Sequence, residues 1–474
     1  MHIDASFFTT AVSGSKIRQG DFPSLFSCSI DSRIPQKGDI FFALRGERSD
    51  GHEFLHEALA NGATGVVISQ KREDLLNQLP DSILVITVPD PLSALIALAR
   101  AWRKRFTFPI VALTGSVGKT STKNLIAHIL EQNQSNYLVA HGNQNTQIGV
   151  AMNIVRMTDQ HDGAVFEIGI NQRGEMGRIV DMLRPTTALI TAIGHSHMEG
   201  LGSLVDIAVE KRDIFKFLKE DSVGFVFGDQ DILSAVSYPH PVIKFGRKTT
   251  NQIQARKVVI TDAEIRCTLK IYNNKYGVVL PYIHGGMLNN ILAAVSVTQY
   301  LGVPKDTIIT AIQKPVVVPR RFQVKPIGDS IMIDDCYNAN PESMKAALLA
   351  LQQLETDAYK VAVLGDMLEL GSDAIFWHRQ VGRFLRKVPS LKHLVLVGTQ
   401  VEHTQATAPR TVKVHRVATW EEAVVYVESI LSRRSVILVK GSRGVGLDKL
   451  VDRCVVQPES SSVQKALHDR EVSA

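Results

Sequence analysis

The chain has 474 residues, of which 45% are hydrophobic and 21% charged, with 53 Lys and Arg against 47 Asp and Glu. This length is enough for about three domains that each bury their own core. The basic residues are scattered apart from short groups at 103–105, 320–321 and 433–434. Because no basic stripe with interleaved aromatic residues is present, we expect no nucleic-acid partner.

The cysteine spacing and the apolar runs exclude further classes of protein. The four cysteines lie far apart, without the CxxC spacing of zinc sites, at Cys28, Cys267, Cys336 and Cys454. No apolar run approaches the roughly 18–20 residues that span a bilayer, and the first residues, MHIDASFFTTAV, lack the order of a signal peptide. We therefore expect a cytoplasmic protein without membrane insertion.

The N-terminal segment, roughly 1–90, reads as a small α/β domain. Short apolar strands are predicted at 41–44, 65–68 and 83–88, with a helix over 53–61. Two polar clusters, 29–33 and 46–52, contain the Asp, Ser and Gly residues typical of turns. Taken alone, both clusters indicate ordinary turn chemistry.

The central segment, roughly 91–317, contains the most informative stretch, IVALTGSVGKTSTKNLI at 110–126. An apolar strand, a glycine-rich loop and a helix over 119–132 are predicted in this order, which is the arrangement that binds phosphate. The phosphate-binding candidates are Gly115, Ser116, Gly118, Lys119, Thr120 and Ser121. Lys119 would reach the outer phosphates and the Thr120 hydroxyl would ligate Mg²⁺. Leu113 replaces the first glycine of the eight-residue P-loop, so a plain strand–helix turn is the alternative interpretation.

Two further strands of this segment end in ionisable residues. The strand over 164–170 carries Glu167, which is costly to bury unless it is paired or metal-bound. The strand over 187–194 precedes His195 and His197, at the rim where α/β sheets bind ligands. The alternatives are an acid on the open face of an edge strand and two structural histidines. Lys211, on a helix beginning near Ser203, reads alone as a surface lysine.

The central segment also contains a stretch, 222–283, that is rich in predicted strands. A linker is predicted at 315–321, where the C-terminal segment, roughly 318–474, begins. Strands at 330–335, 360–366, 394–398 and 435–441 are each followed by a helix-compatible stretch, which predicts a parallel doubly wound sheet. The strand ends place four charged residues along one crevice rim: Asp334, Asp335, Asp366 and Lys440.

Taken together, these motifs resemble the Mur ligase family, most closely its D-alanyl-D-alanine-adding members, over about residues 25–450. They are DSR…GDIFFALRGERSDGHEF, TGSVGKTSTK, GNQNTQIG, EIGINQRGEMG, HSHMEGLGS with EKRDIF, PRRF, DDCYNANPESM, VLGDMLELG and VKGSRG. The resemblance implies three α/β domains: a UDP-sugar domain (1–90), a P-loop-type mononucleotide-binding ATPase domain (91–317) and a Rossmann-like doubly wound domain (318–474) that binds the incoming dipeptide. It also implies a cytoplasmic, monomeric ligase that uses ATP to join D-alanyl-D-alanine to UDP-MurNAc-tripeptide.

The resemblance further implies roles for individual residues. Lys119, Lys211, His197 and Arg321 would be catalytic, and Thr120, Glu167, His197 and Lys211 would hold Mg²⁺, with two ions expected. Lys211 would be carbamylated, which turns a cation into a metal-binding anion. Asn290, Arg321, Asp335 and Asn338 would join the glycine loop around the nucleotide. Substrates would contact Ser32, Arg33, the loop from Arg45 and Gly46 to Gly51, Asn145, Thr146, Asp366 and Lys440.

One stretch departs from the family pattern. Relatives often have a His-Asn pair where this chain has Gly286-Met287, so the adenine contact near Asn290 depends on other residues. Another Mur ligase, or a folylpolyglutamate-synthetase-like amide ligase, is the alternative enzyme. A silent nucleotide-binding protein on the same scaffold is the alternative from another class.

Overall fold

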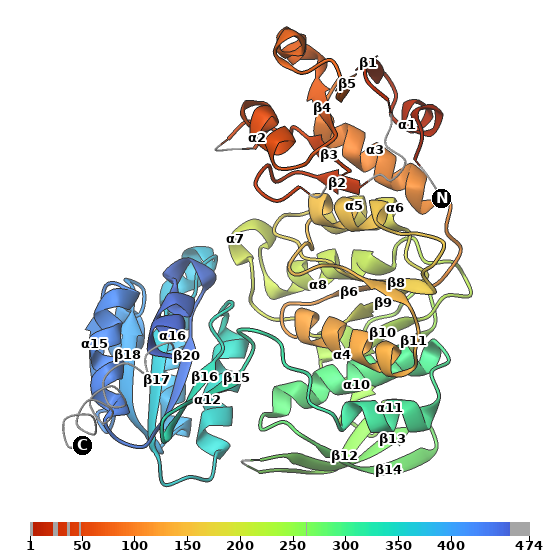
Figure 1. The fold of residues 1–474 in the computed structure, drawn as a ribbon. Helices are drawn as coiled ribbons and strands as arrows, with labels where there is room; N and C mark the ends of the chain where they lie inside the picture. Colours follow the sequence, from red (N-terminus) through yellow and green to blue (C-terminus); the bar gives the residue numbers. More distant parts are fainter. Residues whose placement is uncertain (1–2, 22–26, 36–37, 47–48, 262, 456–474) are drawn as a thin grey trace, which may run out of the picture. The chain divides into compact units, whose positions relative to one another are not determined.

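The computed structural model describes residues 3–21, 27–35, 38–46, 49–261 and 263–455. It contains three sheets that follow one another along the chain, drawn from red through green to blue in Figure 1. The three-domain α/β class predicted from the sequence is confirmed. Each sheet lies within one of the three predicted segments, whose boundaries stay predictions.

The first sheet has five strands in the order β1-β5-β4-β3-β2, with β1 antiparallel to β5 and the others parallel. One face packs Phe41, Val66 and Ile68 against α2 and the following 3-10 helix. The elements are α1 Ala5–Ala11, β1 Lys16–Gln19, β2 Ser27–Ser29, β3 Asp39–Phe42, η1 Gly51–Phe54, α2 Leu55–Ala60, β4 Gly65–Ser69, η2 Gln70–Gln78, β5 Leu84–Val88 and α3 Pro91–Arg103. The sequence did not predict α1, β1, β2, η2 or α3.

The second sheet has nine strands in the order β14-β13-β12-β11-β10-β9-β6-β8-β7. The strands β6, β8 and β7 are parallel, whereas β12, β13 and β14 form an antiparallel extension. Its strands are β6 Ile110–Thr114, β7 Tyr137–Val139, β8 Gly163–Glu167, β9 Thr187–Ile190, β10 Gly224–Phe227, β11 Val242–Gly246, β12 Ile253–Ile260, β13 Ile265–Ile271 and β14 Asn274–Leu280.

The helices of this segment are mostly short, and α4 has the bounds that the sequence predicts. They are α4 Lys119–Gln132, α5 Gln147–Val155, α6 Glu175–Leu183, α7 Met198–Leu201, α8 Leu204–Arg212, η3 Asp213–Phe215, α9 Asp231–Ser234, α10 Gly285–Tyr300 and α11 Lys305–Ile312. The long helices α4 and α10 pack against each other. The 3-10 helix η3 continues directly from α8.

The third sheet, in the order β15-β16-β20-β17-β18-β19, is doubly wound as predicted, apart from an antiparallel edge strand, β15. Along β17, Ala362 and Leu364 enter a core with α12 and α13, whereas Val361 and Val363 enter a core with α15 and α16. This alternation explains why the strand is apolar throughout. The elements are β15 Gln323–Ile327, β16 Ser330–Asp334, α12 Pro341–Gln353, β17 Tyr359–Gly365, η4 Gly371–Asp373, α13 Ala374–Phe384, η5 Leu385–Lys387, β18 Leu391–Val397, α14 Glu402–Gln405, β19 Lys413–Val417, α15 Trp420–Leu431, β20 Ser435–Lys440, η6 Arg443–Val445 and α16 Leu447–Val455.

The predicted linker at 315–321 has no helix or strand and is fixed near both ends. The backbone N–H of Val316 donates to the Tyr282 hydroxyl at 3.0 Å. Arg320 has a positive φ of 61° and pairs with Asp334 at 2.9 Å and with Asp452 at 2.7 Å. These contacts bind the linker to the segments on either side of it.

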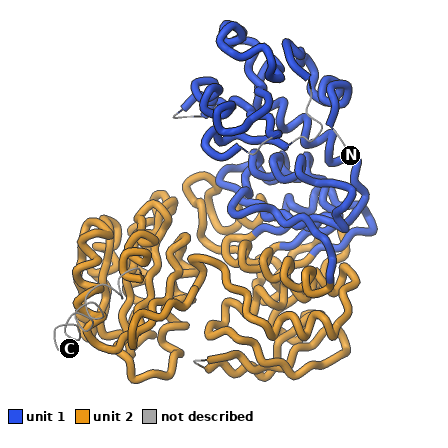
Figure 2. The backbone as a smooth tube through the Cα atoms, in the orientation of Figure 1, with its two compact units in different colours: residues 1–114, 134–189, 212–224 blue, residues 115–133, 190–211, 225–474 orange. Residues whose placement is uncertain are grey.

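By density of contacts the chain divides into two compact units (Figure 2). Unit 1 holds residues 1–114, 134–189 and 212–224, and unit 2 holds 115–133, 190–211 and 225–474. Among the described residues, no helix is both long and apolar enough to cross a membrane.

Candidate active site

The glycine loop follows the fully buried strand β6 and ends at the first turn of α4. Gly115 has φ +154°, and a Cβ there would lie 2.0 Å from Oγ1 of Thr191. Gly118 has φ +89°, and its Cβ would lie 2.2 Å from Oδ1 of Asn290. Both positions therefore require glycine, for conformation and for space. The result is a loop that leads into a helix N-terminus, where phosphate binds readily.

Residues beyond β9 hold this loop in place. The Ser116 backbone N–H donates to the Ala192 carbonyl at 2.7 Å, and its hydroxyl donates to the Gly194 carbonyl at 2.8 Å. The Thr191 hydroxyl donates to the Val117 carbonyl at 2.6 Å. The Lys119 ammonium donates to the Gly115 carbonyl at 2.8 Å, so its side chain folds back over the loop. These bonds fix the loop before any ligand binds, which lowers the entropic cost of binding.

A pocket of about 110 Å³ lies beside the glycine loop, within unit 2. Three parts of the chain contribute to it: the loop with α4, the start of α10, and the C-terminal segment. The lining residues are Val117, Gly118, Ser121, His284, Gly286, Met287, Asn290, Arg321, Phe322, Asp335, Ser343, Ala346, Ala347 and Lys440. Small-molecule sites usually measure about 300–1,000 Å³, so a whole nucleotide would need these walls to part.

The start of α10 contributes residues that include the Gly286-Met287 departure from the family pattern. Asn290 lies against Gly118, and His284 packs its ring on Phe322 with centroids 4.4 Å apart. Burial lowers the pKa of His284 to about 4, which keeps the ring neutral near pH 7. A neutral imidazole and an amide thus line the pocket where the usual His-Asn pair is missing.

The C-terminal segment places a buried ion pair in the same pocket. The Lys440 side chain is 2% exposed, and its ammonium lies 2.8 Å from Oδ2 of Asp335 and donates to the Asn338 carbonyl at 2.9 Å. The Arg321 guanidinium lies 4.0 Å from the ring centroid of Tyr337. The structure therefore groups Lys440 with the residues predicted to bind the nucleotide. A contact between Lys440 and the substrate stays a prediction.

Glu167 ends β8, which lies between β6 and β7 and is not an edge strand. Its side chain is 3% exposed, so the alternative of an acid on an open face is wrong. One oxygen, Oε1, accepts from the Asn145 amide at 3.0 Å. The other, Oε2, is buried without a hydrogen-bond partner among the described residues. A buried carboxylate oxygen in this condition suits a cation.

The two candidate histidines both pair with carboxylates of the C-terminal segment. His195 Nδ1 lies 2.5 Å from Oε1 of Glu342, and the His195 ring stacks on Trp377 with centroids 4.1 Å apart. His197, in a left-handed conformation with φ +52°, has Nδ1 2.5 Å from Oε2 of Glu369. Neither histidine is an isolated solvated side chain.

Lys211 is not the surface lysine that its position alone suggests. Its side chain is 1% exposed, and its pKa is lowered well below the usual value. Burial is the larger cause, and repulsion from the Lys119 ammonium is the second. A lowered pKa favours the neutral amine, which is the form of lysine that reacts with CO₂.

The predicted sugar-binding residues of the N-terminal segment have local partners. The Ser32 hydroxyl donates to Glu57 at 2.5 Å, and Arg33 makes two bonds to Asp31 at 2.8 and 2.7 Å. Arg45 forms an isolated bridge with Asp50, and the Gly46 N–H donates to the Ser49 carbonyl at 2.9 Å. Residues 47 and 48 of this predicted loop lie outside the described part of the chain. A sugar contact stays a prediction for all of them.

Asp366 and Thr146 use their side chains within the fold. The Asp366 carboxylate accepts from the backbone N–H of Thr399 at 3.0 Å and of Val401 at 2.8 Å, which fixes the loop after β18. The Thr146 hydroxyl caps α5 by accepting from the Gly149 N–H. Their contacts with substrate stay predictions.

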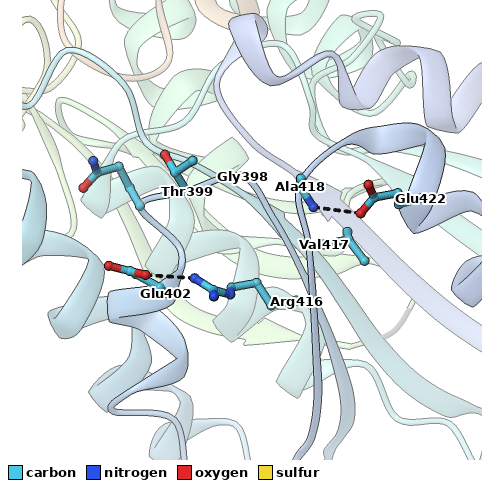
Figure 3. A pocket seen from close by; sticks show the side chains of 8 residues that line it. Gly398, Thr399, Glu402, Arg416, Val417, Ala418 and Glu422 are labelled. Carbon is cyan, nitrogen blue, oxygen red and sulfur yellow. Dashed lines mark hydrogen bonds and ion pairs between the residues drawn. The ribbon is translucent and has the colours of Figure 1, made fainter.

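A second pocket, of about 410 Å³, lies at the carboxyl ends of β18 and β19 and includes Thr399 (Figure 3). Its charged residues are already engaged: Arg416 pairs with Glu402 at 2.9 Å, and Glu422 accepts from the Ala418 N–H at 3.0 Å. We assign no ligand to this pocket.

Sequence reasoning missed several residues that the structure brings to the site. His284 and Phe322 line the pocket beside the loop, and Glu342 and Glu369 pair with the two histidines. The position of His284 directly before the helix start at Gly285 was a usable signal. Nothing local identified Glu342 and Glu369, because their partners lie more than a hundred residues away along the chain.

Comparison with known proteins agrees with these observations. Family models match residues 27–103 ("Mur ligase family, catalytic domain"), 113–298 ("Mur ligase middle domain") and 320–443 ("Mur ligase, glutamate ligase domain"). Two curated relatives are named UDP-N-acetylmuramoyl-tripeptide–D-alanyl-D-alanine ligase. That of Rickettsia prowazekii (strain Madrid E) is 32% identical over 433 residues, 89% of this chain and 93% of the relative. That of Escherichia coli (strain K12) is 33% identical over 440 residues, 91% of this chain and 94% of the relative.

Solved structures show the same likeness. Crystal structure I of MurF from Acinetobacter baumannii is 28% identical, with a TM-score of 0.84, covering 96% of this chain and 99% of that one. MurF ligase from Thermotoga maritima in complex with ADP is 26% identical, with a TM-score of 0.78, covering 90% and 96%. With three family models in order and relatives above 30% identity along nearly its whole length, the chain belongs to the Mur ligase family.

Proposed function

We propose that this protein joins D-alanyl-D-alanine to UDP-N-acetylmuramoyl-tripeptide in an ATP-dependent ligation, a step of peptidoglycan synthesis. The observation that carries the proposal is the near full-length match to curated enzymes with that name, at 32–33% identity. The MurF neighbour solved with ADP supports the use of ATP. The glycine loop of this chain, with Lys119 at the helix start, has the form that such use requires.

The chemistry of the predicted metal ligands fits Mg²⁺. The orphaned Oε2 of buried Glu167 supplies an anionic oxygen, and the Thr120 hydroxyl lies in the first turn of α4. We propose that these two residues, with His197 and a carbamylated Lys211, would hold two ions. Mg²⁺ in that place would neutralise phosphate charge and orient the phosphoryl group. The lowered pKa of Lys211 supports the carbamate, because CO₂ reacts with a neutral amine.

The reaction we propose has two steps. The terminal carboxylate of the peptide attacks the γ-phosphorus of ATP, which gives an acyl phosphate and ADP. The free amine of D-alanyl-D-alanine then attacks the acyl carbon, and phosphate leaves through a tetrahedral intermediate. Both steps need stabilisation of negative charge more than a protein nucleophile. Lys119 and Arg321 would supply that stabilisation at the phosphates, and Asp335, Asn338 and Asn290 would hold the nucleotide.

A substrate-matrix assay of phosphate release tests the proposal. We expect turnover only when ATP, UDP-MurNAc-tripeptide and D-alanyl-D-alanine are present together. Turnover with a single amino acid in place of the dipeptide would instead indicate a sibling ligase. Turnover with a folate acceptor would indicate the folylpolyglutamate branch, and absence of turnover in every combination would indicate a silent nucleotide-binding protein. A monomeric state, a cytoplasmic location and the lack of a nucleic-acid partner stay predictions.

A further inference from the structure

A third cavity lies within unit 1, is unrelated to the proposed reaction and is rich in cations. It measures about 550 Å³, within the range usual for small-molecule sites. Five basic side chains and one carboxylate are among its lining residues: Arg100, Arg103, Lys104, Arg184, Lys219 and Asp181. Phe106, Met182, Pro185 and Phe217 provide an apolar wall. The cavity thus combines positive charge with an apolar surface in one concave place.

The cavity lies at the amino-terminal edge of the central strands, away from the glycine loop. Phe106 and Thr107 line it and come shortly before β6, and Thr186 comes directly before β9. The glycine loop leaves the opposite, carboxyl end of β6. Five strand residues span about 16 Å at 3.3 Å per residue. A ligand here is therefore separate from a nucleotide at the loop.

Helix capping explains one of the five cations. The helices α3 and α6 both end at this cavity, and the carboxyl end of a helix carries a partial charge of about −0.5. The buried Arg103 guanidinium donates to the carbonyls of Leu183, Arg184 and Phe106 at 2.6–2.7 Å. This residue compensates the end of α6 and makes the wall rigid.

The positive charge of the other four basic side chains exceeds the negative charge that remains at the cavity. Asp181 is shared by Arg100, at 2.6 Å, and by Arg184. Arg184 also lies over the Phe217 ring, 4.1 Å from its centroid. Lys104 and Lys219 are exposed on the rim. One carboxylate and one helix end do not balance four cations, so the cavity is electropositive.

We propose that this cavity binds a phosphate-bearing small molecule with a compact planar or apolar part. The phosphate would lie between Lys104, Lys219 and the two exposed guanidinium groups, which match phosphate oxygens as donors. The planar part would pack on Phe217 and Phe106. A concave site of this volume suits a small molecule better than the flat surface that a folded partner needs.

The test measures binding of 1-naphthyl phosphate to the full chain by titration calorimetry, with saturating ADP and UDP present. We expect one site whose affinity falls as salt rises, and at least about tenfold weaker binding in Lys104→Glu/Lys219→Glu, because two charged donors to the phosphate are replaced by repelling carboxylates. The matched double variant Lys16→Glu/Lys71→Glu carries the same charge change on exposed lysines elsewhere in unit 1, and should bind like the wild type.

Three results would overturn the proposal. If the Lys104→Glu/Lys219→Glu variant binds the probe as tightly as the wild type does, the cavity is not the binding site. Loss of binding in Lys119→Ala instead would place the probe at the glycine loop, a result that would reject this cavity without counting against the proposed ligase function. In the third result, 1-naphthyl phosphate fails to bind but the protein sediments with vesicles containing 20% phosphatidic acid, and the Lys104→Glu/Lys219→Glu substitutions abolish that sedimentation. This result would identify a lipid headgroup rather than a free small molecule as the ligand.

Discussion

The Nδ1 atom of His197 lies 2.5 Å from Oε2 of Glu369, which joins the strand end after β9 to the DMLELG stretch after β17. The hydrogen bond from His197 holds the pKa of Glu369 below its usual value. Both residues have a positive φ, of 52° and 62°, a backbone conformation that is costly for residues other than glycine. If His197 binds metal as proposed, Nε2 would be the ligand atom, because Glu369 holds Nδ1 and would orient the ring.

Replacement of Glu369 should therefore change how the metal acts. In Glu369→Gln the carboxylate that orients the His197 ring is gone, so we expect the Mg²⁺ concentration for half-maximal activity to rise about tenfold or more. Mg²⁺ titrations of phosphate release would measure this effect. Glu402→Gln removes a carboxylate that pairs with Arg416 instead of with His197, and it should leave the Mg²⁺ dependence unchanged.

Lys211→Ala should lose most of the activity, at least about a hundredfold in kcat, because a metal-binding side chain disappears. Depletion of CO₂ should slow the wild type, and bicarbonate should restore it. Lys275→Ala, at an exposed lysine on β14, is the control and should remain fully active. Full activity of the Lys211→Ala variant would exclude the carbamate.

Gly118→Ala should reduce kcat/KM for ATP by about tenfold or more. The new Cβ meets Asn290 Oδ1 at 2.2 Å, and the left-handed backbone costs a further ~1 kcal/mol. The double variant Gly118→Ala/Asn290→Ala relieves the collision but not the backbone strain. Steady-state kinetics of both variants and of Asn290→Ala form a double-mutant cycle. A double variant whose kcat/KM for ATP is no higher than that of the Gly118→Ala single variant would show that the collision is absent.

The neutral His284 should make the fold sensitive to acid. Its pKa is lowered to about 4 by burial, against about 6.5 when unfolded, so the unfolded chain takes up the proton first. Its contribution to stability is complete above pH 6.5 and is lost as the pH falls toward 4. His284→Phe keeps the ring against Phe322 and removes the titration, so its unfolding midpoint in urea should fall less between pH 6.5 and 4.5. His393, whose pKa is also about 4, contributes equally to both proteins. Parallel curves for the two proteins would contradict the prediction.

The sequence predicted the parts of the site that depend on local pattern. The bounds of α4 followed from the change of periodicity after Gly118, and Glu167 was located at the end of an apolar strand. The burial of Lys211 could not be predicted from its helix, because its neighbours there do not show which face is covered. The resemblance to a family supplied its role, and the structure supplied the physical reason that fits it.

Contacts between distant segments also could not be predicted, because local patterns do not show which segments meet. The pairing of Glu342 with His195 joins residues 147 positions apart, and neither has a local pattern that indicates the other. The strand β15 was missed because its exposed, alternating residues are typical of an edge, which carries a weak apolar signal. The cluster of basic residues around Arg103 and Arg184 could not be predicted from the sequence either, because folding brings together residues that are distant along the chain.

The two anchors of the linker have a mechanical consequence. Val316 is bound to Tyr282, and Arg320 is bound to Asp334 and Asp452, so three residues, 317–319, lie between the fixed points. Two of them are valines, whose branched side chains restrict rotation, and the third is Pro319, whose φ is set by its ring. A swing of the C-terminal sheet about this pivot would have few degrees of freedom. The joint should act as a stiff hinge with a preferred axis, and a Gly-Gly-Gly replacement of 317–319 should turn it into a loose tether.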